Sequence, residues 1–149
     1  MISAIVSAFH LLALTIGLSS VFLRGRALNG SLDRQGLRRL LAADTVWGVA
    51  AALWLVTGLL RAFAGLEKGT AFYLASSLFW LKMGLFVLIV LLEIRPMVTF
   101  IRWRNALGRG TLPDTSAARA LYHVNHVELA LVVVMVFVAA FMARGFGVR

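Results

Sequence analysis

Four long apolar segments constrain this chain more than any other feature of its sequence. They cover residues 2–24, 40–63, 72–98 and 118–143, approximately, and each reaches the roughly 20 helical residues that cross the hydrocarbon core of a bilayer. Every backbone N–H and C=O inside a bilayer needs a partner within the protein, so each segment is expected to be an α-helix. The sequence therefore predicts an all-α, integral membrane up-down four-helix bundle, with residues 1–149 forming a single transmembrane domain.

The composition supports a lipid environment and excludes several kinds of site. Hydrophobic residues make up 61% of the 149 residues and charged residues only 14%. The formal charge is +9, but the basic residues stand between apolar runs, which indicates membrane topology signals and a lipid bilayer as partner, with no nucleic acid. Since the chain has no Cys, disulfides, thiolate metal sites and iron–sulfur clusters are excluded.

The Lys and Arg residues also predict the orientation. The stretches joining spans one to two and three to four contain ten Arg residues: Arg24, Arg26, Arg34, Arg38, Arg39, Arg95, Arg102, Arg104, Arg109 and Arg119. The opposite side has only Arg61, Lys68, Arg144 and Arg149. Because positive residues concentrate in cytoplasmic loops, we expect both basic connections in the cytoplasm and both termini outside.

The end of the third span contains a proline followed by basic and aromatic residues. Pro96 is predicted to kink this span as it leaves the membrane, because proline lacks the backbone N–H that a helix needs. The following stretch, FIRWRNAL, could continue as a short basic helix at the inner surface, with Trp103 as an interfacial anchor. The favoured alternative is that this segment is only a positive-inside anchor.

Ionisable residues inside the apolar spans are the first candidates for chemistry, because a charge at bilayer depth is costly. Counted from the outer end of its span at the rise of about 1.5 Å per helical residue, His10 lies about 12 Å deep in the bilayer. Lys82 lies about 15 Å deep by the same count. An imidazole nitrogen and a neutral lysine amine can each donate a lone pair to a metal. Facing each other across the bundle, His10 and Lys82 could clamp a haem iron. The alternative for His10 is a hydrogen-bonded core histidine.

Helical periodicity predicts which faces point inward. On span one, small and polar residues form one stripe: His10, Ala13, Gly17, Ser20 and Arg24. On span two, a similar stripe contains Asp44, Gly48, Ala51, Leu55, Gly58 and Ala62. Phe79, Trp80 and Phe86 could wall an apolar pocket near Lys82, or they could be ordinary core or lipid-facing aromatics.

A second polar cluster is expected nearer the cytoplasm, from Asp44, Glu93, His123 and His126. Two His residues one turn apart can chelate an ion, and the carboxylates could complete a metal site or relay protons. The alternative is an interfacial His pair hydrogen-bonded to backbone or headgroups. Glu128 points about 140° away from His123 on a helix, so we assign it to another face or another subunit.

Two runs carry a family resemblance, RRLLAADTVWGVAAALWLVTGLLRAF and GLEKGTAFYLASSLFWLKMGLFVLIVLLEIRPMVTFIRWR. They resemble a family of small bacterial four-span membrane proteins of unknown function. The residues that carry the resemblance are Asp44, Trp47, Gly48, Thr57, Gly58, Arg61, Glu67, Lys68, Gly69, Tyr73, Phe79, Trp80, Lys82, Pro96 and Trp103. This resemblance implies a multi-pass protein of the bacterial cytoplasmic (inner) membrane.

That family is in turn similar to the HemJ-type protoporphyrinogen oxidases and the CopD-like copper-resistance membrane proteins. In HemJ-type members a His in the first span and a Lys in the third together hold haem b, and His10 and Lys82 match these two positions. Copper carriage is less favoured, because the Met residues form no periodic ladder.

The combined prediction is a haem-b-binding membrane protein with a redox or electron-transfer function. A quinone or a porphyrin would bind beside the haem, and Arg61 or Arg24 could pair with the haem propionates at the helix ends. One alternative is a non-enzymatic membrane module, either metal-handling or an accessory subunit of a larger complex. Another is half of a proton-coupled transporter, which would need a homodimer or a partner subunit.

Overall fold

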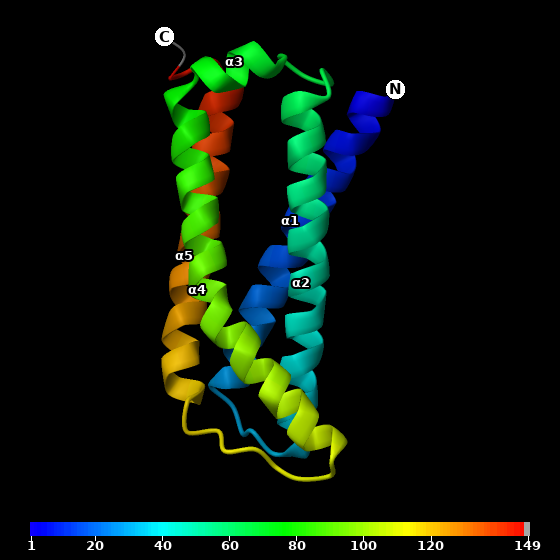
Figure 1. The fold of residues 1–149 in the computed structure, drawn as a ribbon, viewed down its shortest axis with the longest axis vertical. Helices are drawn as coiled ribbons and strands as arrows, with labels where there is room; N and C mark the ends of the chain where they lie inside the picture. The colour runs from blue at the N-terminus through cyan, green and yellow to red at the C-terminus, as the bar shows by residue number, and fades with distance from the viewer. Residues whose placement is uncertain (148–149) are drawn as a thin grey trace.

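The computed structural model describes residues 1–147 and consists almost entirely of helices (Figure 1). Four helices in this part of the chain are long and apolar enough to span a membrane. They are α1 (Ile2–Leu28), α2 (Arg34–Phe63), α4 (Ser77–Gly108) and α5 (Ala118–Ala143). A short helix, α3 (Thr70–Ala75), lies at the same end of the bundle as the N-terminus. The predicted all-α bundle with four spans is confirmed.

The helices extend beyond the predicted apolar spans at the end of the bundle where α1 joins α2, and α4 joins α5. We call this the basic end, and the opposite one the α3 end. Helix α2 begins at Arg34 because the Asp33 side chain caps it, accepting a hydrogen bond from the Gly36 backbone N–H at 2.7 Å. Its first turns therefore carry the arginines that precede the apolar run.

The predicted third span is wrong at both of its ends. It consists of two helices, since extended backbone at Ser76 (φ −86°, ψ 120°) separates α3 from α4. Helix α4 then continues through Pro96 to Gly108, so FIRWRNAL is the last part of a long helix and not a separate surface helix. Figure 1 shows α4 changing direction along its length. A proline inside a helix bends it without ending it where neighbouring helices hold both halves.

Trp103 packs inside the bundle and is not an interfacial anchor. It is only 3% exposed, its ring lies 5.6 Å from that of Phe100, and its Nε1–H donates to the Asp114 carbonyl at 3.0 Å. Trp103 therefore fastens α4 to the α4–α5 connection. The tryptophan fills a gap that the sequence pattern does not reveal, because that gap forms between segments distant along the chain.

Helix α1 packs most extensively on α2, and α4 on α5, while α1 also touches α5. The predicted stripe of α1 is confirmed, because His10, Ala13, Gly17, Ser20 and Arg24 are all buried. The predicted stripe of α2 is only partly confirmed: Ala62 is buried, but Gly48 and Leu55 are exposed. Trp47, Ala50, Trp54 and Thr57 form the central part of the buried face. The small residues of α1 accommodate these large rings. A Cβ on Gly17 would lie 3.2 Å from the Trp47 ring.

The predicted orientation can be measured with single cysteines, because the chain contains none of its own. We expect Leu112→Cys, in the α4–α5 connection, to react with a membrane-impermeant maleimide only in inverted vesicles. Ala64→Cys, between α2 and α3, should react in right-side-out vesicles, since the positive-inside rule places that loop outside. The opposite labelling pattern would show that the bundle is inserted the other way round.

Candidate functional site

A cavity of about 370 Å³ lies toward the α3 end of the bundle, and residues of all five helices contribute to its lining. His10 of α1 and Lys82 of α4 both line it. In the described residues the backbones of α1 and α4 stay apart, and the two helices meet through the long side chains of Arg24 and Glu93. His10 and Lys82 therefore reach the cavity from helices whose backbones are not in contact. The structure thus places in one cavity the two residues that the sequence predicts at similar depths in the membrane. The volume falls in the range of small-molecule sites.

Hydrogen bonds of Thr57 fix the proton position on His10. The Thr57 hydroxyl donates to the Leu53 carbonyl at 2.7 Å and lies 2.9 Å from His10 Nδ1. A hydroxyl has a single proton, so toward His10 the Thr57 oxygen acts as the acceptor and Nδ1–H as the donor. A neutral imidazole then has its lone pair on Nε2, the nitrogen available to a ligand.

Two further residues of α2 position the His10 ring. The ring stacks on Trp54, with centroids 5.6 Å apart and an interplanar angle of 28°. Gly58 makes room for it, because a Cβ there would lie 3.2 Å from His10 Cε1. Trp54 also lines the cavity, and its Nε1–H is buried without a hydrogen-bond partner among the described residues. The cavity wall therefore offers one lone pair and one unused N–H donor.

Aromatic and apolar side chains form much of the remaining wall. Phe79 and Phe86, which the sequence places near Lys82, both line the cavity. Trp80 does not: it is 58% exposed, and its Nε1–H donates to the Leu74 carbonyl at 3.1 Å. Trp80 follows Phe79 directly on the helix, so the two side chains point to different sides. Phe79 faces the cavity and Trp80 faces outward.

The cavity also has charged residues in its lining. The Arg61 guanidinium bonds Glu67 at 2.9 Å, and the Ser7 hydroxyl donates to the same carboxylate at 3.0 Å. Lys68 donates to the Ala143 carbonyl at 2.6 Å. With Lys82, the lining residues within 1–147 include three basic side chains and one carboxylate, that of Glu67. An amphipathic ligand with acidic groups would match this combination of apolar walls and excess positive charge.

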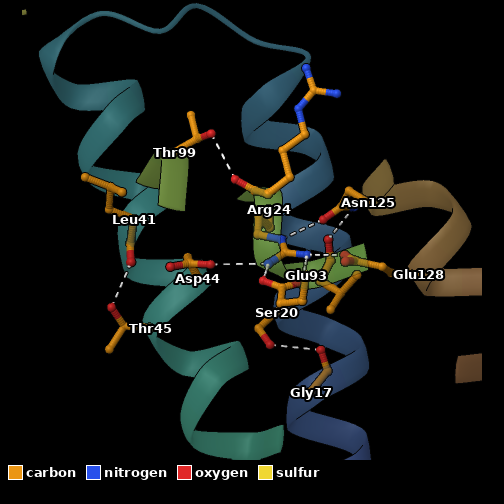
Figure 2. A network of polar contacts seen from close by, with 12 residues as sticks. Gly17, Ser20, Arg24, Leu41, Asp44, Thr45, Glu93, Thr99, Asn125 and Glu128 are labelled. Carbon is orange, nitrogen blue, oxygen red and sulfur yellow. Dashed lines mark hydrogen bonds and ion pairs between the residues drawn. The ribbon is translucent and has the colours of Figure 1, made fainter. Parts of the chain in front are cut away.

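Arg24 lies elsewhere, completely buried in a network toward the basic end (Figure 2). Its Nη1 donates to Asp44 at 3.2 Å and to Glu93 at 2.6 Å, and its Nη2 donates to Glu93 at 3.0 Å and to Glu128 at 2.5 Å. Its Nε donates to the Asn125 side-chain oxygen at 2.7 Å. All five N–H donors of the guanidinium are therefore used within the protein. Arg24 does not line the cavity in which its pairing with haem propionates is predicted.

Glu128 lies on another face of α5 than His123, as expected, but this face points into the bundle and not toward another subunit. Its side chain is fully buried against Arg24, and Figure 2 shows it reaching the guanidinium beside Asn125 of the same helix. Glu128 Oε2 accepts from Arg24, while Oε1 is buried with no partner among the described residues. Asn125 also donates to the Val21 carbonyl at 3.0 Å, which joins α5 to α1.

His123 and His126 do not join the carboxylates, because both are exposed on the other side of α5. His126 Nδ1 lies 2.8 Å from the Tyr122 carbonyl, one turn back on its own helix. Asp44 and Glu93 are brought together as predicted, but around Arg24 and with Glu128 in place of the His pair. Among residues 1–147 no group of three or more His, Asp or Glu side chains is arranged to hold a metal ion.

The 140° separation between Glu128 and His123 is consistent with these positions, but the inner side of α5 is that of Glu128 and not, as predicted, that of the His pair. A usable signal is the spacing of Leu121, Asn125, Glu128, Val132 and Met135, which are buried at intervals of three and four. Asn125 and Glu128 interrupt an otherwise apolar stripe. A polar residue in such a stripe indicates a partner on a facing helix.

The model of the family described as "Predicted membrane protein (DUF2214)" matches residues 2–147, so the chain belongs to that family. No curated protein and no solved structure matches the chain.

Removing the Arg24 charge should destabilise the bundle strongly. We expect Arg24→Gln to lower the free energy of unfolding by about 3–5 kcal/mol, because it leaves buried carboxylates without their cation. Arg104→Gln is the matched control: Arg104 lies 3.6 Å from Asp44 but is half exposed, so a loss of about 1 kcal/mol or less is expected. Unfolding in detergent measures both, and equal losses would contradict a central role for Arg24.

The Glu67 contacts predict a pH dependence outside the spans. Burial alone would raise the pKa of Glu67, but hydrogen bonds from Ser7 and Arg61 and the Arg61 charge bring it below its usual 4.5. A lowered carboxyl pKa stabilises the fold fully above the usual value, and this contribution is lost as the pH falls through the lowered value.

We therefore expect hydrogen exchange in the loop between α2 and α3 to speed up as the pH falls below 4.5, after correction for intrinsic rates. Glu67→Gln should abolish this pH response. Asp114→Asn, a change of the same type in the α4–α5 connection, should leave it intact. If the Glu67→Gln protein keeps the native pH response, Glu67 does not cause it.

Proposed function

We propose that this member of the DUF2214 family binds haem b in the cavity at the α3 end and transfers electrons in the membrane, with His10 and Lys82 as the axial ligands. The observation that supports the proposal most directly is that both residues line one cavity and come from helices whose backbones are not in contact in the described residues. A flat macrocycle held between two side chains needs such an arrangement.

His10 meets the requirements of a metal ligand. The hydrogen bond from Nδ1 to Thr57 leaves the Nε2 lone pair for coordination, and stacking on Trp54 limits rotation of the ring. Histidine ligands of metals commonly donate their other N–H to such an oriented acceptor. Thr57 is therefore a positioning residue, since it acts on the cofactor through His10.

Lys82 would supply the second ligand from the opposite wall. A lysine amine coordinates iron only through the lone pair of its neutral form, and the surroundings of Lys82 include the apolar rings of Phe79 and Phe86. Nonpolar walls of this kind suit a porphyrin plane.

The charged lining residues would hold the acidic edge of the cofactor. Arg61 and Lys68 supply positive charge for propionate groups, and Arg61 would then share its guanidinium between Glu67 and a propionate. An iron with two axial side chains has no open coordination position, so the bound haem would supply electron transfer and not oxygen activation. A quinone or porphyrin in the bilayer is the class of electron partner that such a site suits.

The experiment is the absorbance spectrum of the protein purified in detergent, before and after reduction, with the haem content per chain. We expect a sharp Soret band that shifts on reduction and about one haem per chain. His10→Ala and Lys82→Met should lose or shift this band. The matched control is His126→Ala, because His126 is exposed outside the cavity.

A folded but colourless protein from haem-replete cells would overturn the proposal. A haem spectrum that survives both His10→Ala and Lys82→Met would overturn the assignment of the ligands. Retention of the haem in Lys82→Met with an altered spectrum supports Lys82 as ligand, whereas an unchanged spectrum contradicts it.

A further inference from the structure

The Arg24 network contains more negative charge than its cations can balance. Glu93 takes one bond from each terminal nitrogen of Arg24, at 2.6 and 3.0 Å, which is a complete bidentate ion pair. Asp44 lies 3.2 Å from Arg24 and 3.6 Å from Arg104, so a second cation serves it. With Arg24 committed to Glu93 and Arg104 to Asp44, the carboxylate of Glu128 remains as the excess negative charge.

The position of Glu128 makes that excess charge costly. Its side chain is fully buried, and Oε2 shares an Arg24 nitrogen with Glu93. Its other oxygen, Oε1, has no hydrogen-bond partner among the described residues, and Arg24 has no donor left to give it. An ionised carboxylate with one unsolvated oxygen is far less stable in an apolar interior than a neutral carboxylic acid.

We propose that the network is a proton-binding site, with one exchangeable proton on Glu128 at neutral pH. With this proton the charges of Arg24, Arg104, Asp44, Glu93 and Glu128 sum to zero. No other ionisable side chain of the described residues forms a hydrogen bond or ion pair with these carboxylates. The ligand is the proton itself, and the exchange takes place between Glu128 and water.

The network has a route for that exchange. Glu128 is completely buried, but the side chains of Asp44 and Glu93 are 18% and 21% exposed. Glu93 Oε2 and Glu128 Oε2 accept from the same Arg24 nitrogen, so a partly exposed carboxylate lies beside the buried acid. Arg104, which is half exposed, lies next to Asp44 on the same route.

This proposal is independent of a cofactor at the α3 end. An apolar layer separates the cavity from the network and includes Trp47, Val132, Ile89 and Met135. The test can therefore be made on the protein as purified, whatever the cavity contains. A colourless protein can still bind the proton, and a haem protein can lack it.

Infrared spectroscopy of the full chain in lipid nanodiscs tests the proposal. A protonated carboxylic acid has a carbonyl band separate from the bands of ionised carboxylates, and we expect one such band at neutral pH. It should shift in D₂O, because the proton exchanges, and disappear as the pH is raised while the helices remain folded. Labelling with ¹³C-glutamate should shift the band and labelling with ¹³C-aspartate should not, which assigns it to Glu67, Glu93 or Glu128 without any substitution.

Variants then identify the residue. Glu128→Gln should remove the band, whereas Glu67→Gln and the control Asp114→Asn should keep it. Absence of the band in the native protein overturns the proposal, as does a band that shifts with labelled aspartate. Loss of the band in Glu93→Gln with full retention in Glu128→Gln overturns the assignment to Glu128. A band insensitive to D₂O overturns the exchange.

Discussion

The guanidinium of Arg24 is the interaction on which the arrangement of the four spans depends. It is a buried charge inside an apolar bundle, and its five donors are satisfied by residues of α2, α4 and α5. Since hydrocarbon provides no replacement for these partners, the helices can separate at this end only by exposing unpaired charges. One side chain of α1 thereby fixes the relative positions of the three other spans.

Because the Arg24 network holds the helices together at the basic end, the α3 end can contain a cavity. Helices α2 and α4 pack little against each other. The 370 Å³ cavity lies among the helices, beyond the small-residue face of α1 and the tryptophans of α2. Trp54 takes part in both regions: it belongs to the apolar layer and it stacks on His10. The bundle thus combines a tightly bonded charged end with a hollow, predominantly apolar end, and the proposed electron and proton sites lie on opposite sides of the same layer.

The features that repeat along one helix could be predicted from the sequence. The four spans, the inner stripe of α1 and the common cavity of His10 and Lys82 follow from apolar length, periodicity and depth. The errors concern features that depend on packing between helices. The basic stretch after Pro96 continues α4, Trp103 packs inward, and His126 is exposed apart from the carboxylates, because neighbouring segments decide each of these positions. The burial of Glu128 was missed because an isolated carboxylate suggests an outer face unless its cation is known.

In the proposed function, His10 and Lys82 form the two ends of one cofactor site. Electron paramagnetic resonance and nuclear hyperfine spectroscopy of the oxidised protein, prepared with ¹⁵N-lysine or with ¹⁵N-histidine, test this claim most directly. We expect a low-spin iron signal with one strongly coupled nitrogen from each labelled residue type. An iron coupled to two histidine nitrogens and to no lysine nitrogen, or a protein without any iron signal, would contradict it.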